Sequence, residues 1–345
     1  MRELLKSRRV QAAISIVLAA GLVAWFLSRV SLHDIGRVIA SASPAYLAAS
    51  LAISLLVFVL RALRWIWILR PVGRVPFFPS FRATAVGFAA NTVLPARAGE
   101  VIRPALLAHE EGLPFSALLA SIVFERVLDA LAQLFFLGLA LAGSSGTVGS
   151  FSAGRLRWVA AAAALAAVAV ALFAVVWRET TERLLERLFR LLPEKARGPA
   201  MRIAHTFLDG FASLRSPRLL VLVGLGSLGM WFVINVQVWC TMRAFGLALP
   251  LSAAYVVTTA AVLGLAVPTP GGLGGYHAAV QFALTDIFGV PVATATGVAI
   301  LAHAVSFLPI SLVGFALVAT NPLRKRDLEA ARAASPETPA KKRYS

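Results

Sequence analysis

The stretch LPARAGEVIRP, from Leu94 to Pro104, and its counterpart VPTPGGLGGYH, from Val267 to His277, decide the fold of this chain. Each stretch interrupts a strongly apolar segment with proline, glycine and polar residues. A second Gly-x-Pro signal follows each break, at 112–114 and at 289–291, before another long apolar run begins. Paired breaks of this kind in the two halves of a membrane protein are typical of a substrate site near the middle of the bilayer.

The composition indicates an integral membrane protein. Of the 345 residues, 59% are hydrophobic and only 14% are charged, whereas soluble domains carry about 25% charged residues. A soluble protein of this composition would expose large apolar patches and aggregate. The formal net charge of +17 fits the lysine and arginine that collect in cytoplasmic loops, so we expect no nucleic-acid partner. The single cysteine, Cys240, excludes an intrachain disulfide and is interpreted as a packing residue.

Six apolar segments have the length of about 20 residues that a helix needs to cross a bilayer. They lie near 10–29, 44–69, 114–142, 156–177, 219–245 and 292–320. Two further apolar segments, 80–107 and 253–288, contain the breaks, and we expect both to be re-entrant hairpins whose irregular backbone is surrounded by protein or by a wet cavity. The predicted fold class is therefore an all-α polytopic membrane protein with six full transmembrane helices and two re-entrant hairpins.

The positions of lysine and arginine orient this map. Four of these residues lie among the first nine, nine lie in 178–218 against five acids, and seven lie in the tail from Arg324. Because cytoplasmic loops are enriched in positive charge, both termini are predicted to be cytoplasmic, in a multi-pass protein of the cell's inner (plasma) membrane. The order span, span, hairpin, span then occurs twice with opposite orientation, which is an inverted 3+3 repeat.

The predicted organisation has five parts. The first repeat covers 1–142, the span that opens the second repeat covers 143–177, and the rest of that repeat covers 219–320. Between them, 178–218 is predicted to be a cytoplasmic amphipathic loop that lies on the inner interface. The tail, 321–345, is rich in lysine and arginine and is predicted to be disordered.

Charged residues in the first break suggest an anion site. Arg97, Glu100 and Arg103 recur every three residues, and Asn91 lies just before the break. A charge in the middle of a transmembrane segment costs about 2.5–3.5 kcal/mol on insertion scales, so such residues tend to be functional. Arginine binds a phosphate through two parallel hydrogen bonds and stays charged. We therefore expect Arg97 and Arg103 to hold an anionic group, most simply a phosphate.

The following span carries a polar stripe. Ser121, Glu125, Asp129 and Gln133 recur every four residues, so they share one face of a helix, and Arg126 is adjacent. In the functional interpretation, Glu100, Glu125 and Asp129 orient the arginines or meet a cationic part of the substrate. In the alternative interpretation, the same residues form a buried ion-pair network that only joins the hairpin to the span. Both interpretations can hold together.

The second break is rich in glycine. Gly271, Gly272 and Gly274 leave little side-chain bulk, so backbone N–H groups there are candidates to meet an anion at a helix N-terminus. The alternative is a tight turn that needs glycine for its shape alone. His277 and His303 are candidates to titrate during transport, and the alternative is that each is a hydrogen-bonded packing residue.

Two arginines near the end of the second span, Arg61 and Arg64, are explained by side chains that reach the membrane interface. Trp65 beside them fits an aromatic belt at that interface. The sequence contains no metal-binding His/Cys spacing, no serine-nucleophile elbow and no nucleotide-binding signature. We therefore expect no cofactor, no metal and no catalytic residue.

Three motifs in order resemble the lysylphosphatidylglycerol synthase transmembrane family. They are N-x-x-x-P-x-R-x-G-E-x-x-R from Asn91 to Arg103, E-R-x-x-D from Glu125 to Asp129, and P-x-P-G-G-L-G from Pro268 to Gly274. The resemblance covers about 10–320 and implies a flippase-like protein related to the membrane half of the bacterial multiple peptide resistance factor. In those two-part relatives a soluble domain makes the aminoacyl lipid and the membrane half moves it outward. This chain stops soon after its last span, so the resemblance implies lipid translocation without the synthase chemistry.

The leading functional hypothesis is a lipid translocase that moves a phospholipid or lipid-linked headgroup between leaflets through a polar cavity between the two hairpins. Its partners would be the bilayer, an anionic or zwitterionic phospholipid or lipid-linked substrate, and either a separate synthase or further copies of the chain. Three alternatives remain open. They are a small-solute or ion secondary transporter, a membrane-embedded transferase with Glu125 or Asp129 as general base, and a scaffold subunit beside a separate lipid synthase.

Overall fold

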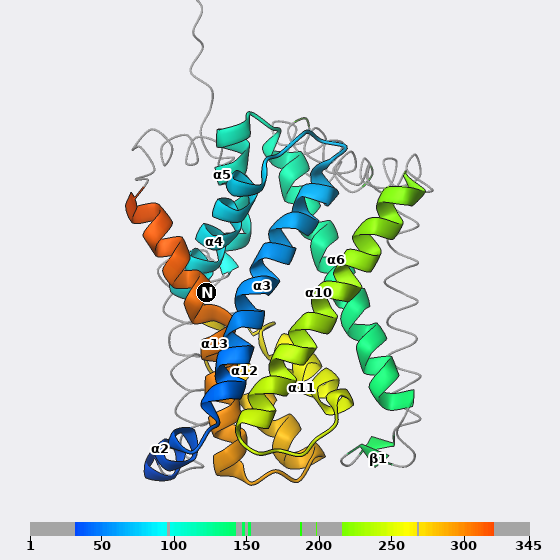
Figure 1. Cartoon of the computed structure of the whole chain (residues 1–345). Coiled ribbons are helices and arrows are strands. Elements are labelled where there is room, and N and C mark those ends of the chain that lie inside the picture. Colours follow the sequence, from blue (N-terminus) through cyan, green and yellow to red (C-terminus); the bar gives the residue numbers. More distant parts are fainter. Residues whose placement is uncertain are drawn as a thin grey trace, which may run out of the picture.

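The computed structural model describes residues 32–94, 97–142, 147–148, 151–152, 187, 198, 216–267 and 269–320. The predicted spans at 10–29 and 156–177 and the tail at 321–345 lie outside these residues, as does nearly all of the loop at 178–218. The helices, shown in Figure 1, are α2 (Leu32–Ala40), α3 (Pro44–Leu69), α4 (Phe77–Val93), α5 (Gly99–Glu111), α6 (Phe115–Ala142), α10 (Pro217–Ala244), α11 (Leu251–Gly264), the 3-10 turn η4 (Pro270–Gly272), α12 (Gly275–Phe282), the π-helix η5 (Ala283–Ile287) and α13 (Val292–Thr320). Two short antiparallel strands, β1 (Thr147–Val148) and β2 (Phe151–Ser152), complete the described part.

Three of the described helices are long and apolar enough to cross a bilayer, namely α3, α10 from Arg218 onwards, and α13. Helix α6 has 28 residues and is equally long, but it carries Glu125, Arg126 and Asp129 near its middle. The prediction of an α-helical membrane protein is thereby confirmed.

The ends of the helices follow from local sequence signals. Pro44 and Pro217 each occupy the first turn of a helix, where the missing N–H would have no partner. Ser216 caps α10 by accepting a hydrogen bond from the Leu219 N–H at 3.4 Å. Gly112 ends α5 in the left-handed conformation, with φ of 65°, which glycine adopts without steric cost.

Helices α4 and α5 form an antiparallel hairpin, so the start of α4 and the end of α5 lie at the same end of the molecule (Figure 1). Near the tip, Gly87 and Gly99 face each other so closely that a Cβ atom on Gly99 would overlap the Gly87 carbonyl. Asn91 Oδ1 accepts a hydrogen bond from the Gly99 N–H at 2.8 Å. At the open end of the hairpin, Arg82 and Glu110 form an ion pair.

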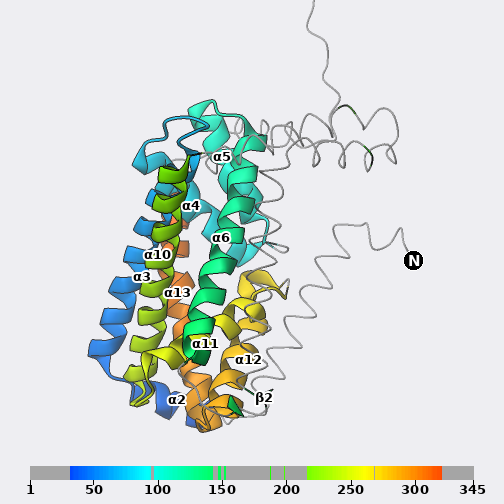
Figure 2. The same ribbon diagram turned by 90° about the vertical axis from the view of Figure 1, so that its right-hand side faces the viewer.

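Helices α11 and α12 form a second hairpin at the opposite end of the molecule (Figure 2). Its two helices also meet at a glycine pair, because a Cβ atom on Gly264 would overlap the Gly275 carbonyl, and the reverse is also true. The connection between them turns through Gly271, Gly272 and Gly274, which have φ of 62°, 71° and 85°. These left-handed angles strain other residues, so glycine is needed here for the shape of the turn.

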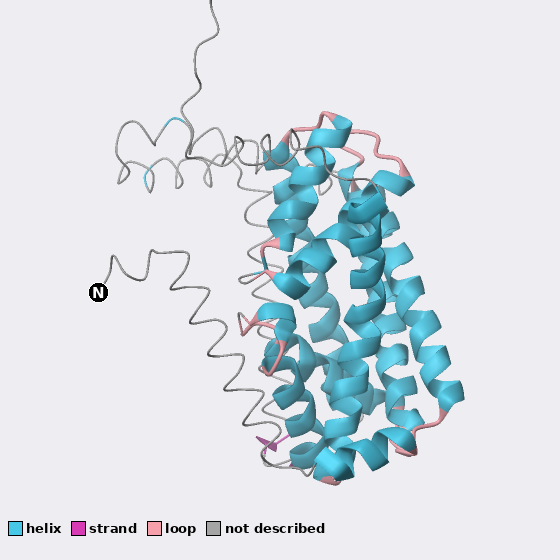
Figure 3. Cartoon of the chain, turned by 90° about the vertical axis from the view of Figure 1, so that its left-hand side faces the viewer, coloured by secondary structure: helices cyan, strands magenta, loops and turns pink. Residues whose placement is uncertain are grey.

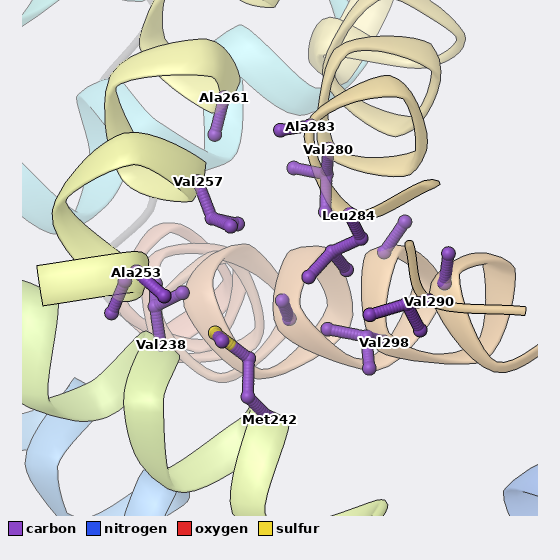
Figure 4. Packing of buried hydrophobic residues seen from close by; sticks show 14 of the residues in the cluster. Val238, Met242, Ala253, Val257, Ala261, Val280, Ala283, Leu284, Val290 and Val298 are labelled. Atoms are coloured by element: carbon purple, nitrogen blue, oxygen red, sulfur yellow. The ribbon is translucent and has the colours of Figure 1, made fainter. Parts of the chain in front are cut away.

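The connecting segments of the two hairpins lie near the middle of the molecule (Figure 3). The turn η4 of the second hairpin also packs against α4, and a Cβ atom added to Gly271 would lie 3.4 Å from the Thr92 carbonyl oxygen. Around them, α3 packs along α10, α4 along α13 and α6 along α11. Figure 4 shows the largest apolar cluster, in which residues of α10, the second hairpin and α13 interlock around Val257, Val280 and Leu284. The two hairpins are therefore held by packing on long helices rather than by each other alone.

We predict that Gly99→Ala and Gly264→Ala destabilise the protein, because each new methyl group would overlap a backbone carbonyl of the facing helix. Overpacking of this kind costs about 1–3 kcal/mol. The measurement is the midpoint temperature of unfolding of the purified protein in detergent. Gly138→Ala in α6 is the control, since nothing lies within 4 Å of its Cβ position. Equal midpoints for all three variants would contradict the close approach at the hairpin tips.

Candidate functional site

The polar stripe of α6 is buried at the centre of the protein. Its members are at most 6% exposed, and they are Ser121, Glu125, Asp129 and Gln133. The four-residue spacing places these side chains on one face of the helix, and that face is buried. A buried carboxylate needs a charged or hydrogen-bonding partner, because transfer out of water is otherwise very costly. The partners of Glu125 and Asp129 therefore determine whether these two charges can be buried.

Glu125 is fully buried and is surrounded by arginines. Arg103 Nη1 donates to both of its carboxylate oxygens at 3.2 Å. Arg126 Nη2 donates to Glu125 Oε1 at 2.8 Å, and Arg61 Nη1 donates to the same oxygen at 3.3 Å. Arg64 Nη2 lies 3.2 Å from that oxygen as a further ion pair. Four guanidinium groups from α3, α5 and α6 thus share one carboxylate.

Asp129 extends this network to α10. Arg64 Nη1 donates to Asp129 Oδ1 at 2.7 Å, and the Trp231 indole donates to the same oxygen at 2.8 Å. Arg126 Nη2 lies 3.3 Å from Asp129 Oδ2, and Arg61 Nη1 lies 3.8 Å from it. The name "arginine cluster" is used below for Arg61, Arg64, Arg103 and Arg126 with the two carboxylates, Glu125 and Asp129.

The interpretation of Arg61 and Arg64 as residues that reach the membrane interface is wrong. Arg61 is 7% exposed and Arg64 is 1% exposed, and both point into the protein to the carboxylates of α6. The interface position of Trp65 is also wrong. Its ring is fully buried, donates to Ser121 Oγ at 2.9 Å and lies under the Arg103 guanidinium at 3.9 Å. Packing of α3 against α6 places all three side chains inside.

The remaining residues of the first break lie at the edge of the arginine cluster. The Arg97 side chain is 44% exposed and pairs with Glu100 at 3.6 Å. Arg97 also has φ of 55°, a left-handed conformation that is uncommon for a residue other than glycine. Glu100 lies 4.0 Å from Arg126 as well. Asn91 braces the hairpin tip through its hydrogen bond to Gly99, so its first role is structural.

A cavity of about 400 Å³ lies beside this cluster and between the two hairpins. That volume falls within the range of about 300–1,000 Å³ typical of small-molecule sites. Of the residues singled out from the sequence, the cavity is lined by Asn91, Arg97, Glu100, Arg103, Arg126, Asp129, Gly271 and Gly272. Glu125 lies behind the wall, where it positions the arginines, and Arg61 adds an unexpected fourth arginine to the lining.

The two histidines lie together behind the second break. Their ring centroids are 4.7 Å apart, and His303 Nε2 donates to the Gly271 carbonyl at 2.8 Å. Neither His277 nor His303 is among the residues that line the cavity, and the same is true of Gly274. His303 thus fixes the backbone of a lining residue, which makes it a support of the site.

The charges around the cavity do not balance. Among the described residues, the arginine cluster together with Arg97 and Glu100 contains five arginines and three acids, which leaves a formal excess of two positive charges. Several guanidinium nitrogens of these arginines are buried without a hydrogen-bond partner, including Arg61 Nε, Arg103 Nε and Nη2, and Arg126 Nε. Unpaired buried donors of this kind call for an anion.

In the part of the chain that the structure describes, no group of three His, Cys, Asp or Glu side chains is placed to hold a metal.

Sequence reasoning missed the contribution of α10. Ser227 accepts a hydrogen bond from Arg64 Nη1 at 3.0 Å, and Trp231 binds Asp129. Asn235 is fully buried one helical turn further along. These three residues recur every four positions, which is the same spacing that revealed the stripe of α6, so the signal was present in the sequence.

We predict that Glu125→Ala strongly destabilises the protein, because it leaves three buried arginines, Arg61, Arg64 and Arg103, with one remaining buried carboxylate. Removal of one partner from a buried ion pair costs about 3–5 kcal/mol. The measurement is the unfolding midpoint in detergent together with the yield of monodisperse protein. Glu100→Ala is the control, because the Glu100 side chain is 29% exposed. A Glu125→Ala variant as stable as Glu100→Ala would show that the arginine cluster does not hold the fold together.

Comparison with known proteins finds relatives that include membrane proteins. The chain is 25% identical over 329 residues to the glycosyltransferase AglD of Haloferax volcanii, an alignment that covers 87% of this chain and 52% of that protein. This chain therefore spans about half the length of the Haloferax relative. Two UPF0104 membrane proteins of Methanothermobacter thermautotrophicus are 23% and 24% identical over 303 and 324 residues. These alignments cover 81% and 88% of this chain and 85% and 90% of the relatives.

The family described as "Lysylphosphatidylglycerol synthase TM region" matches residues 12–314, which is most of the chain. That range includes the arginine cluster, both hairpins and the cavity between them. The resemblance suggested by the three sequence motifs is confirmed, and the chain is a membrane protein that belongs to the lysylphosphatidylglycerol synthase transmembrane-region family.

Proposed function

We propose that this protein is a lipid translocase that moves the headgroup of an anionic lipid between leaflets through the cavity beside the arginine cluster. The single observation that carries the proposal is the excess of positive charge around a cavity inside an apolar protein. Two carboxylates cannot neutralise four arginines, so the cluster attracts a further anion. A phosphate matches the planar, doubly donating guanidinium groups of Arg61, Arg103 and Arg126.

Exposed apolar side chains at the edge of the cavity support the proposal that this phosphate belongs to a lipid. Leu263 lines the cavity and is 68% exposed. Val93 and Leu94, next to the lining residue Thr92, are also exposed, as is Leu273, next to Gly272. Apolar side chains on the outer surface of a membrane protein face acyl chains. A lipid would therefore place its headgroup in the cavity and keep its tails in the bilayer.

We further propose that the two hairpins are re-entrant and belong to an inverted 3+3 repeat with six full spans. Helices α4, α5, α11 and α12 have 17, 13, 14 and 8 residues, each shorter than the roughly 20 that a full span needs. The pairing of α4 with α13 corresponds to the pairing of α11 with α6. Each hairpin also crosses at a glycine pair. With both termini cytoplasmic, in the inner membrane, the first hairpin would open inward and the second outward.

A transferase is the second candidate, because the Haloferax relative is named a glycosyltransferase. General-base catalysis requires a carboxylate that is free to accept a proton from the attacking group. The two carboxylates that line the cavity, Glu100 and Asp129, are both paired with arginines. The geometry therefore favours movement of the lipid over chemistry on it.

The translocase proposal predicts that Arg97→Gln slows transport without unfolding the protein. Arg97 lines the cavity and is half-exposed, and among the described residues it forms an ion pair with Glu100 alone, so its replacement leaves the arginine cluster intact. We expect at least a tenfold loss of rate, since a charge-assisted hydrogen bond to phosphate is worth about 1.5–3 kcal/mol. The assay is the exposure of fluorescent phosphatidylglycerol on the far leaflet of proteoliposomes.

The control is Arg74→Gln, which removes the same charge from an exposed residue in the loop before α4. Both variants should reconstitute to the same extent and unfold at the same temperature. Equal transport rates for Arg97→Gln, Arg74→Gln and the unchanged protein would remove Arg97 from the mechanism. Absence of lipid movement by the unchanged protein, with uptake of a soluble anion instead, would favour a small-solute transporter.

A further inference from the structure

The cavity has two chemically different sets of polar groups. The arginines come from α3, the first hairpin and α6. The polar groups contributed by α10, the second hairpin and α13 are all uncharged. Apart from the Trp231 indole, which binds Asp129, they are Gln237, Thr258, Thr269, Tyr276 and Ser306. The cavity therefore combines a phosphate-binding set with a neutral hydrogen-bonding set, and the second set is not needed to bind a phosphate.

The neutral set contains hydroxyl groups without partners. Thr258 is 3% exposed and Thr269 is 5% exposed, and the Oγ1 atom of each has no hydrogen-bond partner. Leaving a buried hydroxyl unpaired is unfavourable, so such groups in a cavity wall mark a place where a ligand or water completes the bonding. Gln237 Nε2 donates to Ser306 Oγ at 3.0 Å, which fixes one amide of the same wall.

We infer that the headgroup carries an uncharged polyhydroxyl group, a sugar or a glycerol, attached to the phosphate. This inference rests on the proposed lipid translocation and names the class of lipid. Threonine, serine and tyrosine hydroxyls together with an amide both donate and accept hydrogen bonds, as neutral hydroxyl groups of a ligand do. The phosphate lies at the arginines and the hydroxyl groups lie at Thr258 and Thr269.

The same wall disfavours a cationic headgroup such as lysyl-phosphatidylglycerol. An ammonium group has three donors and no acceptor, so it needs a free carboxylate or several free acceptors. The carboxylates that line the cavity, Glu100 and Asp129, already pair with arginines. A cationic headgroup would also approach the four lining arginines, and like charges placed together repel each other. The cavity thus differs in chemistry from what an aminoacyl lipid requires.

The test is the relative affinity of lipids that share the same acyl chains, measured by native mass spectrometry of the purified full-length chain. The probes are phosphatidylinositol, with a sugar-like polyol, phosphatidylglycerol, phosphatidylethanolamine, lysyl-phosphatidylglycerol and phosphatidate. We expect phosphatidylinositol and phosphatidylglycerol to bind at least fivefold more tightly than the two lipids with an amine. The stronger of these two polyol lipids identifies a sugar or a glycerol as the better fit.

The double variant Thr258→Val, Thr269→Val removes both unpaired hydroxyls while keeping the shape of the side chains. It should weaken the two polyol lipids about fivefold, since each neutral hydrogen bond is worth about 0.5–1.5 kcal/mol, and leave phosphatidate unchanged. Thr259→Val is the matched control, because the Thr259 hydroxyl donates to the Tyr255 carbonyl and is not part of the lining.

Two results would overturn the inference while leaving translocation intact. They are lysyl-phosphatidylglycerol binding as tightly as phosphatidylinositol, and unchanged polyol affinity in the double variant. Failure to bind any of the five lipids would instead contradict the proposed function itself, because phosphatidate requires only the arginines.

Discussion

The fully buried carboxylate of Glu125, shared by four guanidinium groups, is the interaction on which the rest of the structure depends. Inside an apolar protein a charge is tolerated only with close partners, because its hydration is lost. Glu125 gathers arginines from α3, α5 and α6, and Asp129 adds Trp231 of α10. One network therefore fixes the first hairpin and three long helices around the cavity, and its unbalanced positive charge is also what makes the cavity attractive to an anion.

The sequence predicted the carboxylates that α6 contributes to this network but not the arginines that α3 contributes. The four-residue spacing of Glu125 and Asp129 placed both on one helical face, and both are buried. Arg61 and Arg64 near the end of an apolar helix were interpreted as residues that reach the membrane interface, whereas both pair with buried acids. The packing of α3 against α6 places both side chains inside, and that contact is tertiary information that spacing along α3 does not contain.

The sequence indicated the roles of the glycines and histidines to different degrees. Of the two interpretations of the glycines in the second break, the tight turn is seen in the structure, because three of these glycines have left-handed φ. The close approach of helices at Gly87 and Gly264 depends on the partner helix, which the sequence around each glycine does not identify. His277 and His303 are candidates to titrate during transport or packing residues on sequence grounds; in the structure their tilted rings are in contact outside the cavity lining, and His303 supports the wall through Gly271.

The two hairpins are alike in backbone and unlike in chemistry. Each has two short helices that cross at a glycine pair, such as Gly87 with Gly99, yet the lining arginines belong to one half and the unpaired neutral hydroxyls of Thr258 and Thr269 to the other. A cavity with identical halves would accept a headgroup in either direction. In the proposed translocase, charge would attract the phosphate to one half of the cavity and neutral groups would complete the other, which would hold the headgroup in a single orientation. Recognition would then require the symmetry of the backbone to be broken by the side chains.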